Sequence, residues 1–263
     1  MEVKERMVVM SKIKICIDPG HGGSDRYNRG KTGYIEADGM LDISLKLRDE
    51  LLSTGAFDIL MTRDKDMTVG VSERGNIAAR WGANMFISEH SNATGKATNT
   101  TRRTVDVYYS IKRPNDKDLA NKFAKSISQV MNNKVGGAKT WESTNYPGND
   151  YLGVINASAK GNVPHIFLIE NGFHDNLEDE AVLKNPEKRT EIAKAQAKVI
   201  CDFYGVQYPV KVVKEMDWKQ KIVKEAYDLG LITSEEWLEK AEEKATVWFV
   251  LATLINLYNK LKG

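Results

Sequence analysis

The sequence has little cysteine, since only Cys16 and Cys201 occur among its 263 residues. Both lie in apolar surroundings and far apart in the chain, which favours free, buried thiols over a disulfide. So few cysteines are compatible with a reducing compartment. They are also too few for a cysteine-based zinc site, so a metal in this chain would need histidine and carboxylate ligands.

An excess of charge of one sign is also missing. The chain has 38 Lys and Arg residues against 36 Asp and Glu residues, for a formal net charge of +2. That balance gives no electrostatic footprint for nucleic acid as a partner. The longest apolar stretch, residues 245–258, is too short and too interrupted to span a membrane. Residues 1–10 lack the apolar core of a secretory signal peptide, and we expect them to be an N-terminal extension outside the fold.

What the sequence does contain is an alternation of strand and helix patterns over residues 11–206. Short apolar or β-branched runs predict strands at 13–18, 57–62, 85–88, 104–110, 151–155 and 165–170. Helical periodicity predicts helices at 38–52, 71–81, 116–131, 178–184 and 186–204. The alternation predicts an α/β fold with a mainly parallel, twisted sheet and helices on both of its faces.

The composition changes near Pro209, and we expect a linker over residues 207–216. The remainder, residues 217–263, predicts a small all-α module with helices at 217–229 and 245–261 and a capping-box pattern at 233–236. A module of this size has little core of its own. We therefore expect it to pack on the first domain, on a second copy in a dimer, or on a ligand.

Chemistry-bearing side chains gather at predicted strand ends. His21, His90 and Glu170 each follow or close a predicted strand, where sites form in α/β folds. Glu36 lies beyond a glycine-rich loop that is long enough to fold back on His21. Two imidazoles and one carboxylate can form a zinc shell with one position left for water, and a separate carboxylate can act as general base. From spacing alone, a zinc site and ordinary buried or loop histidines both remain open.

The motifs around these residues are more specific than their spacing. Six blocks follow one another in order: Ile17–Gly23, Glu36, Thr62-Arg63, Glu73–Ala79, Phe86–Ala93 and Leu168–Phe173. Over residues 12–204 the chain resembles the zinc-dependent N-acetylmuramoyl-L-alanine amidases of the family-3 type. The resemblance implies Zn²⁺ bound by His21, Glu36 and His90, with Glu170 as the catalytic residue. It also implies peptidoglycan as the substrate, cut at the amide between N-acetylmuramic acid and L-alanine.

The resemblance leaves the biological role open. With no secretory signal, we expect a phage or prophage endolysin that stays in the cytoplasm until it is released to the cell wall. The alternatives are a bacterial autolysin or sporulation lysin, a zinc peptidase that cuts within the stem peptide, and a non-catalytic wall-binding protein. Residues 217–263 are similar to surface-layer-homology modules, which suggests attachment to the wall through a secondary polymer. A packing or dimerisation role for this module is the alternative.

Five further residues are candidates for substrate contacts. Arg102 and Arg103 can meet stem-peptide carboxylates or form a solvated pair. Asn92 and Asn171 flank the proposed metal and catalytic positions and can bind substrate amides. His174 either contacts substrate or lies on the surface.

Two neighbouring carboxylates are candidates for supporting roles. Glu89 should point away from His90 because strand side chains alternate, which leaves it an outer-shell or a surface position. Asp18 can orient His21 as an outer-shell carboxylate or simply form the turn before Pro19.

Overall fold

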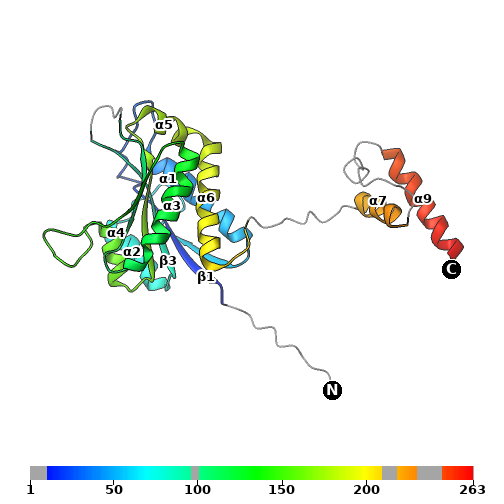
Figure 1. Cartoon of the computed structure of the whole chain (residues 1–263), viewed down its shortest axis with the longest axis horizontal. Helices are drawn as coiled ribbons and strands as arrows, with labels where there is room; N and C mark the ends of the chain where they lie inside the picture. Colours follow the sequence, from blue (N-terminus) through cyan, green and yellow to red (C-terminus); the bar gives the residue numbers. More distant parts are fainter. Residues whose placement is uncertain (1–10, 96–100, 209–217, 230–244, 263) are drawn as a thin grey trace, which may run out of the picture. The chain divides into compact units, whose positions relative to one another are not determined.

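The computed structural model describes residues 11–95, 101–208, 218–229 and 245–262. The chain divides into two compact units, Met1–Val210 and Lys211–Gly263 (Figure 1). The predicted extension 1–10, most of the predicted linker 207–216 and the predicted capping box 233–236 lie outside the described residues.

The first unit is built on a sheet whose six described strands run in the order β2-β1-β3-β6-β4-β5. The strands are β1 Ile13–Pro19, β2 Phe57–Met61, β3 Met85–Asn92, β4 Thr104–Tyr109, β5 Lys134–Lys139 and β6 His165–Phe173. Neighbouring strands are parallel except β4 and β6, which are antiparallel. The predicted mainly parallel sheet is confirmed, and β1, β3 and β6 bring their carboxyl ends to one edge.

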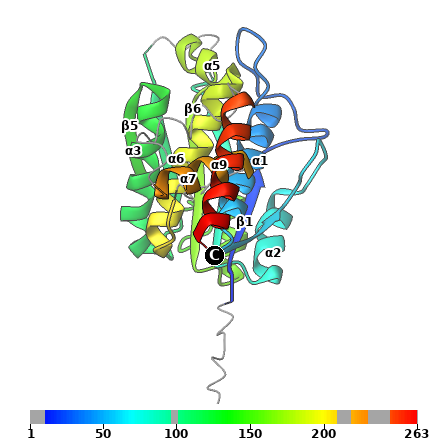
Figure 2. The same cartoon turned by 90° about the vertical axis from the view of Figure 1, so that its right-hand side faces the viewer.

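Helices cover both faces of this sheet, as predicted. Figure 2 shows α3 (Lys117–Met131), α6 (Pro186–Tyr204) and α1 (Glu36–Ser53) side by side on one face. The other face carries α2 (Val71–Trp81) and α4 (Gly153–Lys160), and α5 (Leu177–Lys184) precedes α6. Strand alternation divides the core between the faces, because Ile15 and Ile17 of β1 pack in one apolar cluster and Cys16 in the other.

Two predictions about elements are wrong, and one strand was not predicted. Residues 151–155, predicted as a strand, lead into the helix α4, whose Val154 and Ile155 both pack in the second apolar cluster. The edge strand β5 was not predicted, because Gly136 and Gly137 weaken the strand pattern. Gly136 is needed there, since a Cβ would lie 1.7 Å from Asp106 Oδ1. His90 lies within β3 and not beyond its end, because β3 continues to Asn92.

The described part of the second unit consists of α7 (Trp218–Asp228) and α9 (Ala245–Lys262). The two helices pack through Val223, Ala226, Leu251 and Ile255. They agree with the predicted helices of an all-α module. Within the described residues, no helix combines the length and the apolar character that a membrane crossing requires.

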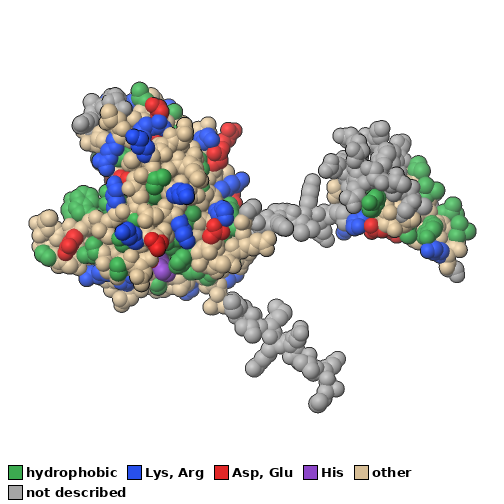
Figure 3. All heavy atoms as spheres, viewed as in Figure 1, with side chains coloured by type: hydrophobic (Ala, Val, Ile, Leu, Met, Phe, Trp, Pro, Cys, Tyr) green, Lys and Arg blue, Asp and Glu red, His purple; other side chains and the backbone are tan. Residues whose placement is uncertain are grey.

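The surface of the first unit mixes both signs of charge. Basic and acidic side chains are interspersed on the face seen in Figure 3, in keeping with the near-zero formal charge of the chain.

Candidate metal centre and active site

His21 lies in a tight turn that follows β1, and its backbone is in the left-handed region with φ 59°. Such a conformation costs free energy for a residue with a Cβ, so the surroundings must hold it. Two buried arginines do so. Arg74 Nη2 donates to His21 O (2.8 Å), and Arg63 donates to Pro19 O (2.9 Å) and Gly20 O (2.8 Å).

Gly20 lets this turn approach β3 closely. Its N–H donates to Glu89 O (2.9 Å), and a Cβ at this position would lie 2.4 Å from His90 Cε1. The imidazoles of His21 and His90 consequently meet edge to face, with ring centroids 5.0 Å apart. The glycine before His21 is therefore required by the contact between the two imidazoles.

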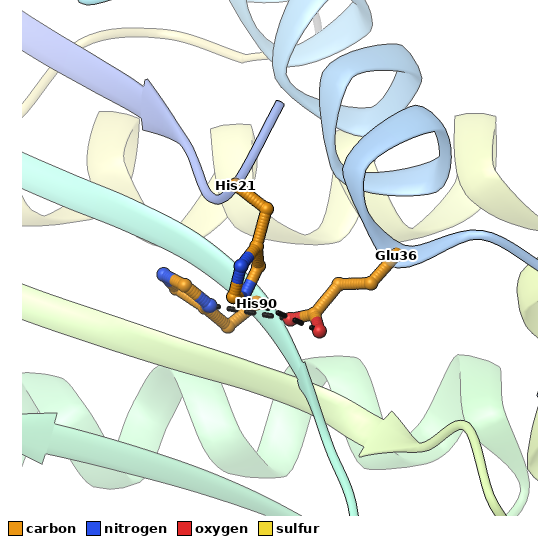
Figure 4. Close-up of side chains that lie close together, drawn as sticks. All are labelled: His21, Glu36 and His90. Carbon is orange, nitrogen blue, oxygen red and sulfur yellow. Dashed lines mark hydrogen bonds and ion pairs between the residues drawn. The ribbon is translucent and has the colours of Figure 1, made fainter. Parts of the chain in front are cut away.

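Glu36 is the first residue of α1 and points its carboxylate at both imidazoles (Figure 4). Its Oε2 lies 3.4 Å from His21 Nε2, and its Oε1 lies 3.2 Å from His90 Nδ1. Ser91 N also donates to Oε1 (2.8 Å). Glu36 is buried, and its Oε2 accepts no hydrogen bond from any described residue. A buried carboxylate oxygen in that state needs a cationic partner.

The three side chains suit a zinc ion. One ligand atom from each of His21, Glu36 and His90 lies within 4.8 Å of the others. Ligands bound tetrahedrally at about 2.0–2.2 Å are separated by roughly 3.4 Å, close to the two distances given above. The set of two imidazoles and one carboxylate is also one that zinc hydrolases use. The predicted ligands are therefore brought together in a geometry that fits the metal.

The electrostatics of the cluster favour positive charge beside Glu36. Burial alone would raise the pKa of Glu36, but the facing imidazoles of His21 and His90 lower it well below its usual range. Burial likewise opposes protonation of His21, yet the carboxylates of Glu36 and Asp25 raise its pKa to about 9. The site thus stabilises cationic groups against one buried carboxylate, as binding of a divalent cation requires.

Asp25, which the sequence did not single out, is the outer-shell carboxylate of His21. Its Oδ2 lies 2.8 Å from His21 Nδ1, an interaction that leaves Nε2 directed at Glu36. Asn28 Nδ2 lies 3.2 Å from the other ring nitrogen, His21 Nε2. Asp25 and Asn28 both lie in the glycine-rich loop. Many polar residues of that loop are equally plausible partners of His21, so the sequence pattern does not single out these two.

Asp18 has neither of the roles expected for it. It is fully buried and accepts hydrogen bonds from Arg74 Nη1 (2.7 Å), Ser88 Oγ (2.6 Å) and Thr62 Oγ1. Because β1 continues through Pro19, Asp18 is a strand residue and not a turn residue. Its side chain is buried against the neighbouring strands and α2. It therefore supports His21 only indirectly, by anchoring Arg74.

Glu170 lies opposite His90 in the register between β3 and β6. Its Oε2 is buried and has no hydrogen-bond partner among the described residues. Burial raises its pKa well above the usual value, and the nearby carboxylates of Glu36 and Asp106 raise it further. A carboxyl group that holds a proton readily beside a metal centre suits proton transfer in both directions.

A cavity with largely apolar walls adjoins this centre. His21, Asp25 and His90 line it together with Val71 of α2, Leu152, Gly153 and Val154 at the start of α4, and Leu168 of β6. The two histidines of the predicted ligand set therefore face a space where a substrate can bind between α2 and α4.

Of the five candidates for substrate contacts, Arg102 and Asn92 both contact Asp106. Arg102 is half-exposed, stacks its guanidinium over the Phe173 ring (5.0 Å) and lies 3.6 Å from Asp106 Oδ2. Asn92 Nδ2 lies 3.5 Å from the same carboxylate oxygen. Asp106 is directly opposite Glu170 in the β4–β6 register, so both candidates contact the residue that pairs with Glu170.

The other three candidates have protein partners. Arg103 donates to Asp179 Oδ1 (2.9 Å) and also pairs with Glu178. Asn171 is fully buried and is described below with Glu89. His174 is buried, so the surface position considered for it is wrong. Its Nδ1 lies 2.9 Å from Ser91 O and 3.9 Å from Glu36 Oε2.

Glu89 points away from His90, as predicted, but into the interior and not to the surface. Asn171 Nδ2 donates to Glu89 Oε2 (2.7 Å) and to His90 O (3.2 Å), and Gln196 Nε2 donates to Glu89 Oε2 (3.1 Å). This buried network joins β3, β6 and α6 directly behind the His90–Glu170 pair.

Comparison with known proteins agrees with this site. Residues 15–202 match the family model Amidase_3, described as N-acetylmuramoyl-L-alanine amidase. The amidase CwlM of Bacillus licheniformis is 33% identical over 188 residues, which cover 70% of this chain and 66% of that relative. The endolysin of Bacillus phage SPP1 is 29% identical over 222 residues, which cover 81% of this chain and 76% of the endolysin.

A solved structure supports the fold. The crystal structure of an N-acetylmuramoyl-L-alanine amidase from Clostridium difficile 630 aligns with a TM-score of 0.64 and 23% identity, over 74% of this chain and 97% of that one. The chain spans just under two thirds of the length of the Bacillus licheniformis relative. Because the family model covers most of the chain and spans all six motif blocks, the resemblance of the motifs is confirmed. The chain belongs to the Amidase_3 family of N-acetylmuramoyl-L-alanine amidases.

Proposed function

We propose that this chain hydrolyses the amide between N-acetylmuramic acid and L-alanine in peptidoglycan, and that it uses zinc to do so. The observation that carries the proposal is the convergence of His21, Glu36 and His90 beside the buried Glu170, whose Oε2 has no hydrogen-bond partner among the described residues. Membership of the family supports the choice of bond.

An amide resists hydrolysis because its carbonyl is a weak electrophile and its amine a poor leaving group. When bound, zinc supplies a Lewis acid that polarises the carbonyl and makes water more acidic. Glu170 takes a proton from the attacking water and delivers it to the departing nitrogen. The water oxygen joins the carbonyl carbon and the C–N bond breaks, which leaves a lactyl carboxylate and the free amine of L-alanine. Asp25 keeps His21 oriented throughout.

The bond is tested by analysing the fragments released from purified peptidoglycan. The proposal expects intact stem peptides with a free L-alanine amine, and glycan strands without new reducing ends. Shorter peptides cut inside the stem would identify a zinc peptidase instead. If no soluble fragments are released while the protein still binds the walls, the chain is a non-catalytic wall-binding protein.

We further propose an endolysin role, because the phage endolysin is matched over 76% of its own length, more than the 66% of the Bacillus licheniformis amidase. Such an enzyme accumulates inside the cell and reaches the wall once a holin opens the membrane. Lysis that requires a co-expressed holin supports this role. Lysis without one supports an autolysin or sporulation lysin, and one relative, from Bacillus subtilis, is named a sporulation-specific N-acetylmuramoyl-L-alanine amidase.

A further inference from the structure

The first unit carries three aromatic rings in a row that the proposed chemistry does not use. Trp141 stacks on Tyr151, with ring centroids 4.1 Å apart and an interplanar angle of 19°. Trp141 also contacts Tyr108 of β4, at 6.3 Å between centroids. We call Tyr108, Trp141 and Tyr151 the aromatic ledge. Its loop follows β5 and projects beside α4, in green in Figure 1.

Two of the three rings are exposed to solvent. Trp141 is 47% exposed and Tyr151 54% exposed, whereas Tyr108 packs against the second apolar cluster. Trp141 contacts both other rings, so Tyr151 is at the end of the row farther from Tyr108, and about half of its surface remains accessible to a ligand. Two large aromatic side chains that share an exposed surface are characteristic of binding sites, whereas isolated exposed ones are ordinary.

The backbone around the ledge is fixed before any ligand binds. Tyr151 N donates to Trp141 O (2.8 Å), which sets the two rings side by side. The adjacent Asp150 accepts hydrogen bonds from Ser110 Oγ (2.7 Å) and Ile111 N (2.8 Å). A surface held in this way loses little conformational entropy on binding.

The position of the ledge connects it with the metal centre. Leu152 and Gly153 directly follow Tyr151 and line the cavity that also contains His21 and His90. Tyr151 itself lines a neighbouring hollow with Asn149, Asn156 and Lys160. The ledge therefore offers a flat apolar face, with amide and ammonium groups at its edge, next to the substrate cavity.

This combination suits a sugar that carries an acetamido group. The C–H groups on one face of a pyranose ring pack on the electron-rich face of an aromatic ring. The hydroxyl and acetamido groups around the ring can then hydrogen-bond to side chains such as Asn149, Asn156 and Lys160. We propose that the aromatic ledge binds an N-acetylhexosamine ring of the glycan strand beside the cleaved amide. This inference rests on the proposed function, because peptidoglycan places such a ring close to that bond.

Binding is tested on the full chain carrying Glu170→Gln, titrated calorimetrically with tetra-N-acetylchitotetraose. We expect saturable binding that Tyr151→Ala weakens about tenfold, the loss of one stacking contact. Tyr151→Phe keeps the ring and should bind like the parent chain. Equal affinity in the Ala and Phe variants, or no binding by the parent, would overturn the proposal. This measurement does not depend on which bond the enzyme cuts.

Kinetics give a second, independent test. In the active enzyme, Tyr151→Ala should raise KM for long glycan strands about tenfold while kcat changes less than twofold. Trp141→Ala should act in the same direction, with the melting temperature measured to confirm folding. An unchanged KM in the folded Tyr151→Ala variant contradicts the ledge. An equal rise in KM for a lactyl peptide without any sugar and for long strands assigns the ledge to the stem peptide and also contradicts the proposal. If the parent chain releases no stem peptides from peptidoglycan, the proposed function is wrong. The calorimetric titration still tests whether the aromatic ledge binds an N-acetylhexosamine.

Discussion

His21 occupies a backbone conformation that costs free energy, and its neighbours keep it there. Arg63 and Arg74 donate hydrogen bonds to the carbonyl oxygens of the turn from Pro19 to His21. Asp18 forms an ion pair with Arg74. These charged side chains are buried, so their desolvation is offset only while the turn keeps its shape. At the scale of single residues, the shape of the proposed metal centre depends on buried polar groups other than the three proposed ligands.

Glu89 in particular predicts a pH dependence of stability. Burial raises its pKa to about 7, although hydrogen bonds from Asn171 and Gln196 oppose the rise. The folded pKa of this carboxyl group lies above its unfolded value of about 4.3. Its contribution to the unfolding free energy is therefore largest below about pH 4.3 and is lost as the pH rises through the folded pKa of about 7. We expect Glu89→Gln to gain about 2 kcal/mol in unfolding free energy relative to the parent chain between pH 5 and pH 8.

Urea denaturation at pH 5, 6, 7 and 8 measures this gain. Glu191→Gln, at an exposed position on α6, is the matched control and should follow the parent at each pH. A constant difference between Glu89→Gln and the parent across this range would show that Glu89 does not titrate there.

At the scale of elements, the close contact between α2 and α4 shapes the substrate cavity. A Cβ at Gly75 of α2 would lie 2.6 Å from Ser158 N and 2.7 Å from Val154 O of α4. The start of α4 lines the cavity beside the metal ligands. The spacing of these two helices therefore determines the width of the site.

Gly75→Ala tests this contact. The added methyl group must push the helices apart, so we expect a loss of about 2 kcal/mol in unfolding free energy and a rise in KM. Gly70→Ala is the control, because a Cβ there meets nothing closer than 3.9 Å, and its stability should stay within about 0.5 kcal/mol of the parent. Equal stability of the two variants would show that α2 and α4 tolerate a wider spacing.

Elements with a strong local pattern could be predicted from the sequence. Helix α6 begins at Pro186 after an Asn185 cap and ends before Gly205, and these signals place its bounds correctly. The strand β5 could not be predicted because Gly136 is required by a long-range contact with Asp106. The helix α4 could not be predicted because Val154 and Ile155 near its start are β-branched. The metal ligands stand in recognisable motifs, whereas Gln196 meets Glu89 across 107 residues of sequence. Such a contact exists only in the folded chain.

At the scale of the whole molecule, every residue of the candidate site belongs to the first unit. The second unit exposes an apolar series on α9, with Val250, Leu254, Leu257 and Leu261 each at least 44% exposed. The 4-3-4 spacing of this series places it on one helix face. The sequence raised two roles for this module, attachment to a secondary wall polymer and pairing with a second copy, and both stay predictions.

A chain that ends at residue 210 separates the two units. We expect it to cleave a soluble muramoyl peptide with the kcat of the full chain, because the site is complete without residues 211–263. Sedimentation with insoluble walls should fall if the second unit binds a wall polymer, and the molar mass in solution should halve if it mediates a dimer. A loss of cleavage of the soluble peptide by a truncated chain that remains folded would show that the second unit contributes to the site.

The central claim is that His21, Glu36 and His90 hold zinc while Glu170 moves protons without binding it. Zinc content and peptidoglycan hydrolysis, measured together in Glu170→Gln and Glu36→Gln, test that division most directly. We predict that Glu170→Gln keeps one zinc ion per chain and loses activity by a factor on the order of 10³, whereas Glu36→Gln loses both zinc and activity. Hydrolysis at the parent rate by Glu170→Gln, or full activity in a Glu36→Gln chain without zinc, would contradict the account.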